Sequence, residues 1–176
     1  MPLTEVSTDD ADAVLEFFFE LSAEERTFFW DDLTDSAVVA RWVGDPRRHS
    51  MAVLEDGRIS AFAALVPQTE WSSHVAELVL VVGSWARRNG HGRALAQSML
   101  IGALRNGFTK VTVSVAADQP GAIAMFQGIG FQAEALLRDH LREPETGEMR
   151  DLVILSHLVE DTYAHMLAAG LDQAIG

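Results

Sequence analysis

One segment, from Ala76 to Arg105, constrains the fold more than any other part of the chain. It begins with an uninterrupted apolar run of strand length, Leu78 to Val82, and it closes with apolar residues at helical spacing from Leu95 onward. Between the two lies a loop rich in glycine and arginine. The periodicity therefore predicts a buried strand, a loop and a helix in succession.

The loop concentrates positive charge at the predicted start of the helix. It contains Arg87, Arg88, Gly90, Gly92 and Arg93, in a chain whose formal net charge is −13. Glycine lets the backbone turn its N–H groups toward one point, and the N-terminus of a helix carries a partial positive charge. The loop is therefore expected to bind an anion.

Two other interpretations of the glycine pair have to be weighed. A Gly-x-Gly sequence at a helix start can serve only to permit a tight turn. A dinucleotide-binding loop would place Gly-x-Gly-x-x-Gly directly after the strand, whereas here residues 83–88 intervene and position 95 is leucine. The dinucleotide interpretation is therefore disfavoured, and the tight turn stays open as the alternative to an anion site.

The loop resembles a motif of a known family. Arg87-x-x-Gly90-x-Gly92 begins five residues after Val82, and it is similar to the acetyl-CoA pyrophosphate loop of the GNAT superfamily of N-acetyltransferases. Downstream, the run Ala124 to Phe131 (AMFQGIGF) is similar to the family's helix ending in Gly-Phe. The resemblance covers most of the chain. It implies a transferase of the acyltransferase class, with acetyl-CoA as the acetyl-donor cosubstrate.

The resemblance also implies how CoA would bind. In this family two parallel strands splay apart, and the pantetheine arm lies in the gap, pairing with the first strand's backbone like an added strand. Backbone amides from Arg88 to Arg93 would hold the pyrophosphate, and the side chain of His91 is expected to have no chemical role. The implied cofactor-binding residues are Leu80, Val81, Val82, Arg87, Arg88, Asn89, Gly90, His91, Gly92, Arg93, Gln119 and Phe126.

Acetyl transfer to an amine needs a base more than it needs an acid. An alkyl amine with a pKa of about 10.4 is neutral only to roughly one part in 2,500 at pH 7, so making the nucleophile costs about 4 to 5 kcal/mol. Expelling a thiol with a pKa of about 8.5 as thiolate costs only about 2 kcal/mol. Glu77 resembles the glutamate that several family members use, directly or through water, to take the amine proton. Glu77 is therefore the candidate base. Alternatively, Glu77 is a strand-edge carboxylate without a chemical role, and His74 or Glu70 serves as the base instead.

The acid side departs from the family pattern. The helix that usually carries asparagine and, seven residues later, tyrosine has Gln119 and Phe126 at these positions. The tyrosine that commonly protonates the departing thiolate is therefore absent. The chain's one tyrosine, Tyr163, lies in the C-terminal tail, where packing with a solvated hydroxyl is its expected role.

Composition narrows the partners and the compartment. The chain of 176 residues is 48% hydrophobic, enough for one domain with a substantial core, and it has no run suited to crossing a bilayer. The absence of cysteine excludes disulfides, thiolate catalysis and a cysteine metal site, and no metal is expected. Residues 1–5 lack the features of a signal peptide, so a cytoplasmic protein is expected. A sequence pI near 4.7 argues against nucleic acid and anionic membrane as partners and suits a small cationic substrate.

The remaining segments predict the elements around the central strand. Strands are expected at residues 3–6, 51–54, 59–66, 110–115, 131–141 and 149–157, and helices at residues 11–21, 36–43, 118–130 and 159–170. Asp56-Gly57 predicts a two-residue hairpin. The capping box Ser22-x-x-Glu25 predicts that the first helix breaks and restarts. Among residues 5–35 the acidic residues are opposed by one basic residue, Arg26. They form a solvated helix face or, as the resemblance implies, cover the acceptor site.

These elements predict a single α/β domain with a GNAT-like fold. The sheet is expected to be mixed and mostly antiparallel, with a central splayed parallel pair, and helices are expected to flank it. Residues 1–176 would form one N-acetyltransferase domain, in which residues 159–176 are a helical tail that covers the sheet. A dimer contact is the alternative use of this tail, and both a monomer and a homodimer fit the sequence.

The sequence therefore predicts a cytoplasmic, acetyl-CoA-dependent N-acetyltransferase. The expected acceptor is a primary amine of a small molecule or, less favoured, of a peptide, and the amine would attack the thioester directly. Two alternatives stay open: a catalytically weak acyl-CoA-binding sensor, which Phe126 would explain, and a phosphate-ligand binding module unrelated to CoA. The identity of the acceptor depends on loops such as residues 31–35 and 143–148.

Overall fold

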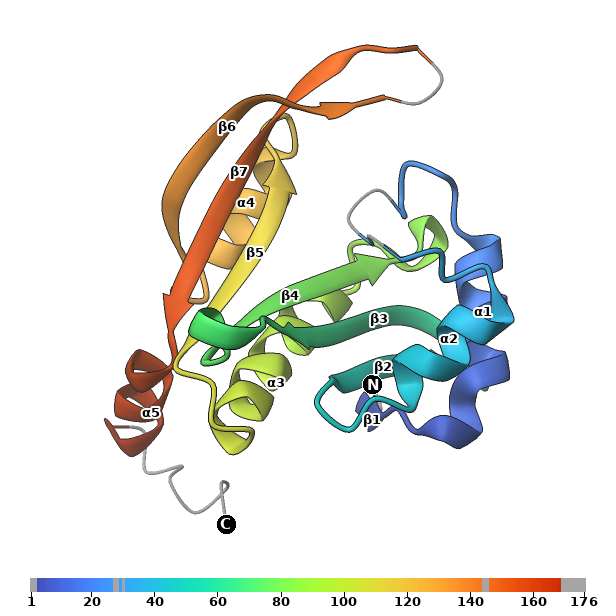
Figure 1. The fold of residues 1–176 in the computed structure, drawn as a ribbon, viewed down its shortest axis with the longest axis horizontal. Coiled ribbons are helices and arrows are strands. Elements are labelled where there is room, and N and C mark those ends of the chain that lie inside the picture. The colour runs from blue at the N-terminus through green and yellow to red at the C-terminus, as the bar shows by residue number, and fades with distance from the viewer. Residues whose placement is uncertain (1–2, 27–28, 30, 144–145, 169–176) are drawn as a thin grey trace.

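Asp56 and Gly57 turn the chain between its first two long strands. Both have positive φ, 52° and 80°, as a two-residue type I′ hairpin requires. This turn joins β2 (His49–Glu55) to β3 (Arg58–Pro67), with β1 (Leu3–Glu5) beside β2 and β4 (Val75–Val82) beside β3. The computed structural model describes residues 3–26, 29, 31–143 and 146–168, and in it these four strands form one antiparallel half of the sheet (Figure 1).

The other half of the sheet is built from β5 (Lys110–Ala116), β7 (Met149–Leu158) and β6 (Gln132–Arg142). In the described residues the sheet has seven strands in the order β1-β2-β3-β4-β5-β7-β6. Within it, β4 and β5 run parallel and the other neighbouring pairs run antiparallel. The predicted mixed, mostly antiparallel sheet with a parallel pair at its centre is therefore confirmed.

The parallel pair stays together over only part of its length. The ladder between β4 and β5 contains three residue pairs and ends where Glu77 pairs with Thr112. Beyond that point β4 remains paired with β3 and β5 with β7, so each strand follows its own half of the sheet. Figure 1 shows the two halves diverging from this junction. The splay that the resemblance implied is present.

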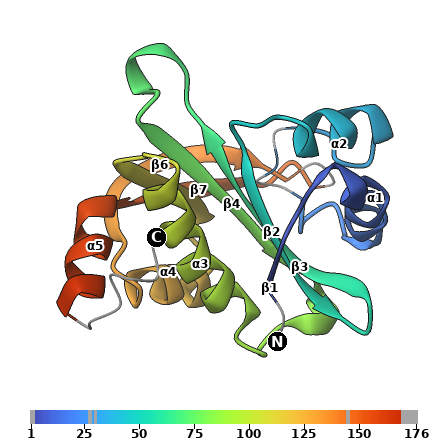
Figure 2. The same cartoon turned by 90° about the horizontal axis from the view of Figure 1, so that it is seen from below.

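Helices cover both faces of the sheet (Figure 2). On one face, α1 (Ala11–Glu20) and α2 (Ser36–Val43) pack on β2, β3 and β4 through an aromatic core. On the other face, α3 (His91–Arg105) links β4 to β5, and α4 (Pro120–Gln127) links β5 to β6. Alternating side chains of β4 supply both cores, because successive residues of a strand point to opposite faces.

Two expectations about the helices need correction or completion. The capping box forms, with Glu25 accepting from the Ser22 amide at 2.9 Å, but residues 23–26 make a turn and the helix does not restart there.

The tail forms α5 (Val159–Ala168), which packs against α3 and β7. The side chain of Tyr163 and residues 169–176 lie outside the described part, so the predictions for them stay untested. Among the described helices, none combines the length and the apolar character that crossing a membrane requires.

Candidate active site

The arginine-rich loop enters α3 through two residues with left-handed backbone. Arg88 has φ of 68°, and Gly90, the N-cap of α3, has φ of 81°. The helical hydrogen bonds begin where the Ala94 amide donates to the Gly90 carbonyl at 3.1 Å. The amides of Gly92 and Arg93 therefore precede the ladder, and the geometry of a helix start aims such groups outward along the axis. This end of α3 has the form of an anion site.

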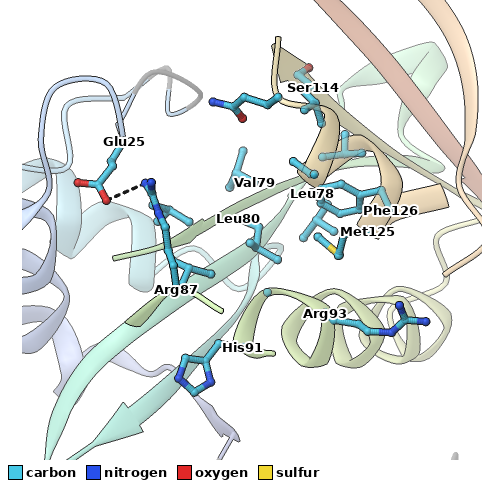
Figure 3. Close-up of a pocket in the computed structure, with 18 of the residues that line it drawn as sticks. Glu25, Leu78, Val79, Leu80, Arg87, His91, Arg93, Ser114, Met125 and Phe126 are labelled. Carbon is cyan, nitrogen blue, oxygen red and sulfur yellow. Dashed lines mark hydrogen bonds and ion pairs between the residues drawn. The ribbon is translucent and has the colours of Figure 1, made fainter. Parts of the chain in front are cut away.

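A cavity of about 770 Å³ opens between the parted strands and reaches this loop. It is lined by β4 (residues 77–82), the loop and first turn of α3 (86–88 and 90–93), β5 (113–115), α4 with its start (119, 121, 122, 125 and 126) and the turn after α1 (24 and 25). Figure 3 shows Leu80 and Met125 facing each other across it. Its volume falls within the usual range for small-molecule sites, about 300 to 1,000 Å³.

The two strands present different chemistry to the two faces of the sheet. On β4, Leu78 and Leu80 belong to the core under α3, whereas Val79 belongs to the core under α1 and α2. Strand alternation therefore places Glu77, which is in phase with Val79, on the α1 face. By the same argument Ser114 of β5 lies on that face, because Val113 and Val115 pack under α3. The cavity thus joins an apolar α3 side with a polar α1 side.

Glu77 and Ser114 meet directly across the gap. The Ser114 hydroxyl donates a hydrogen bond to Glu77 Oε1 at 3.0 Å, and both side chains are partly buried. Glu77 is the last β4 residue paired with β5, so its carboxylate stands at the point where the cavity begins. A carboxylate in this position could accept a proton from a group that enters from the α1 face.

A second carboxylate reaches the cavity from the turn after α1. Glu25 Oε1 lies 3.0 Å from Arg87 Nη2, and the Glu25 side chain is 7% exposed whereas that of Arg87 is 57% exposed. The same Glu25 closes the capping box on Ser22. The ion pair therefore joins the arginine-rich loop to the turn that borders the α1 side of the cavity (Figure 3).

The start of α4 forms the third wall. The backbone carbonyl of Gln119 accepts hydrogen bonds from the amides of Ala122 and Ile123, which fixes the first turn of α4. The carboxylate of the preceding Asp118 accepts from Nε and Nη2 of Arg150, at 2.9 and 2.7 Å. The hydrogen bond from the Arg150 side chain is the main reason why the pKa of Asp118 lies below its ordinary value. This pair anchors the turn that carries Gln119 into the cavity.

Phe126 occupies the position where the family pattern has tyrosine. It is 4% exposed, lines the cavity, and packs edge-to-face on Phe131 with ring centroids 5.3 Å apart. The ring is thus part of the core under α3 as well as part of the cavity wall.

Most of the residues predicted from the sequence come together, but not all of them do. Glu77, Phe126, Gln119 and the predicted cofactor residues other than Asn89 line the cavity, whereas Asn89 and His74 are exposed and fall outside the lining. Glu70, with φ of 52°, also lies outside it. The roles of all these residues stay predictions.

The side chains of two loop residues face away from the cavity. The ring of His91 is buried and points away from Leu80 and Met125 (Figure 3). Its Nε2 lies 3.0 Å from Glu55 Oε1, so it ties the start of α3 to the β2–β3 hairpin. Arg93 donates to the Gly128 carbonyl at the end of α4 at 3.0 Å. Both residues are also among those that line the cavity, and the expectation that the His91 side chain has no chemical role stays a prediction.

Sequence reasoning missed several lining residues. Glu24 and Glu25 were noted only as part of an acid-rich stretch and a capping box, and Met125 only as part of a motif. Val79 gave no site signal of its own beyond strand alternation, and Ser114 was considered only as a group that could help the thiolate to leave, not as a partner of Glu77. Their place in the cavity depends on how far β4 and β5 separate, which no local pattern specifies.

Comparison with known proteins gives this arrangement a family. Residues 15–131 match the model of the acetyltransferase (GNAT) family. No curated protein matches the chain significantly. Among solved structures, an acetyltransferase of the GNAT family from Streptococcus pneumoniae is 19% identical, with a TM-score of 0.79 over 89% of this chain and 98% of that one.

Two further structures share the fold. A GCN5-related N-acetyltransferase from Kribbella flavida is 26% identical, with a TM-score of 0.75 over 89% of this chain and 96% of that one. A putative acetyltransferase from Salmonella typhimurium, solved with its cofactor acetyl-CoA, is 16% identical, with a TM-score of 0.79 over 90% of this chain and 93% of that one. With its family model and its splayed sheet, the chain belongs to the GNAT family of acetyltransferases, enzymes that use acetyl-CoA.

Proposed function

We propose that this acetyltransferase moves the acetyl group of acetyl-CoA to a primary amine of a small cationic molecule, by direct attack of the amine on the thioester. One observation carries the proposal: a single cavity connects the anion-binding loop on the α3 side with Glu77 on the α1 side, through the gap between β4 and β5. A thioester in this gap would be open to an amine that arrives from the opposite face.

In this proposal the residues of the α3 side hold the donor. Backbone amides at the start of α3 would take the pyrophosphate, and the unpaired β4 edge at Leu80 to Val82 would pair with the pantetheine arm. Leu80, Met125 and Phe126 offer an apolar wall to that arm. The residues present therefore fit acetyl-CoA, which supplies the activated acetyl group.

Glu77 would accept the amine proton. A protonated alkyl amine must lose its proton before it can attack, at a cost of about 4 to 5 kcal/mol at pH 7. A carboxylate at the junction of the strands stands where the nucleophile enters, and general bases typically contribute about 10² to 10⁴-fold in rate. The thiolate could leave with help from water, from Ser114 or from backbone amides at the splay, since that step costs only about 2 kcal/mol.

The acidic α1 side supports a cationic acceptor. Glu24, Glu25 and Glu77 line this part of the cavity, and the whole chain carries a formal net charge of −13. Such a field raises the local concentration of cations and disfavours anionic acceptors.

We propose the cytoplasm as the compartment, because the chain has no cysteine and needs no oxidising environment.

The direct test is thiol release from acetyl-CoA with a panel of acceptors. Small mono- and diamines, matched neutral alcohols, and peptides with free N-termini should be compared at equal concentration, with product mass confirming the acetylated atom. Release with small amines above the alcohols supports the proposal. Release only with peptides would reassign the acceptor class, and tight acetyl-CoA binding without release from any acceptor would favour the acyl-CoA sensor that Phe126 could also explain.

A further inference from the structure

We propose that Ser114 is the positioning residue of the catalytic base. This inference rests on the proposed function, in which Glu77 takes the amine proton. Ser114 carries no role in the family motifs that led to the site. The structure instead brings its hydroxyl to 3.0 Å from Glu77 Oε1, from a strand that belongs to the other half of the sheet.

The place of this hydrogen bond gives it a purpose. Glu77 pairs with Thr112 in the last rung of the parallel ladder, and Ser114 lies two residues further along β5 on the same face. Past this rung the backbones separate, so hydrogen bonds between the two strands no longer fix the side chains there. The Ser114 hydroxyl is the contact that holds the Glu77 carboxylate toward β5, at the mouth of the cavity.

The chemistry of the donor suits a base. A serine hydroxyl donates one hydrogen bond to Oε1 and leaves Oε2 able to accept the proton of the entering amine. Holding the carboxylate in one rotamer keeps its second oxygen within reach of the nucleophile, and small misplacements of a catalytic group can lower rates by up to about 10²-fold. Ser114 therefore acts through Glu77 and does not itself touch the amine.

The test compares two substitutions of nearly equal shape. Ser114→Thr keeps the hydroxyl and Ser114→Val replaces it with a methyl group, and both β-branched residues favour the strand conformation of β5. We expect Ser114→Thr to keep kcat within about twofold of the wild type, whereas Ser114→Val lowers kcat about tenfold. The KM for acetyl-CoA should change little in either variant, because the hydroxyl lies on the α1 face.

A double-mutant cycle then connects the effect to Glu77. In a Glu77→Gln background, Ser114→Val should lower kcat no further, because the group that it positions is gone. Equal losses in Ser114→Thr and Ser114→Val, or losses that multiply with Glu77→Gln, would overturn the positioning role while leaving the base in place. A Glu77→Gln enzyme with full activity would instead overturn the base, and with it this inference. Melting temperatures with and without acetyl-CoA confirm that each variant is folded.

Discussion

The two ends of the cavity are encoded in different ways. The loop from Arg87 to Arg93 is one continuous stretch, in which two glycines, clustered arginines and a helix start provide an anion site from consecutive residues. The Glu77–Ser114 pair joins residues 37 positions apart, on strands from the two halves of the sheet. In the proposed site, backbone amides of consecutive residues would bind at the loop, so the loop can be recognised as a sequence motif. The Glu77–Ser114 pair is formed by side chains that only the fold brings together.

The comparison predicts that changes at the two ends have separable effects. A change in the loop should act on acetyl-CoA binding, whether or not an amine is present. A change at the pair should act on turnover, with binding of acetyl-CoA preserved. A variant that moved both quantities together would break this division.

The largest effect is expected from Gly92→Val. A Cβ at this position would lie 3.5 Å from Val82 Cγ2 and 3.8 Å from Leu80 Cδ2, which are ordinary contacts, so the first atom of a side chain fits without displacing its neighbours. The branched side chain would project where the pyrophosphate must approach the amides. Acetyl-CoA at a hundred times its Kd stabilises a protein by about 2.7 kcal/mol, and we expect the variant to lose this thermal shift entirely.

Gly92 makes a cleaner test than Gly90. With φ of +81°, Gly90 adopts a conformation that side chains rarely tolerate, so Gly90→Val would strain the backbone even without a ligand. The control is the melting temperature of the apo variant, which should stay near that of the wild type. Equal acetyl-CoA shifts in wild type and Gly92→Val would remove the loop from the binding site.

Glu77→Gln should have the next largest effect, on turnover alone. We expect kcat to fall by about 10² to 10⁴-fold at neutral pH, with the acetyl-CoA thermal shift unchanged. The loss should shrink as the pH rises toward the amine pKa of about 10.4, because the nucleophile then deprotonates without help. A pH–rate series for both proteins measures this. A loss that is constant with pH, or no loss, would remove the role of base from Glu77 and leave the deprotonation of the amine to water.

The sequence predicted most of the fold because its signals are local. The bounds of α2, the hairpin at Asp56-Gly57 and the strand–loop–helix around Gly90 all follow from capping, turn and periodicity rules that involve neighbouring residues. The capping box at Ser22 formed, but residues 23–26 make only a turn, and the same Glu25 also pairs with Arg87, 62 residues away, which no local rule predicts.

The polar α1 side of the cavity was less predictable, because its contacts join residues that are distant in the sequence. Glu77 was singled out by resemblance, but its partner Ser114 depends on the register between β4 and β5 and on the point where their ladder stops. The substitutes His74 and Glu70 were near Glu77 in sequence and fall outside the cavity, since the chain there leads into the start of β4. Distance along the chain is a poor guide to a site made by parting strands.

Phe126→Tyr should raise turnover modestly, by about tenfold or less, if the new hydroxyl supplies the missing proton to the thiolate. The ring lines the cavity and also packs on Phe131, so the hydroxyl must point into the cavity, because a buried unpaired hydroxyl costs about 1 to 3 kcal/mol. Single-turnover thiol release from pH 6 to 10 compares the two proteins. An unchanged rate together with a lowered melting temperature would show that the hydroxyl is buried in the core.

The smallest and most diagnostic effect is expected from Glu25→Gln, because Glu25 connects the two ends. Its carboxylate holds Arg87, the first residue of the loop motif, and places negative charge beside the proposed pyrophosphate site. The neutral isostere removes both the competitor for Arg87 and the repulsion. Pairs with an exposed member are worth about 0.2 to 1 kcal/mol, so acetyl-CoA should bind roughly 1.4- to fivefold more tightly. Titration at low and high salt measures the Kd, and the gain should diminish at high salt because screening weakens the charge that was removed. Weaker binding would show instead that Glu25 orients Arg87 for the donor, in which case the acidic side of the cavity contributes to donor binding and the division between the two ends no longer holds.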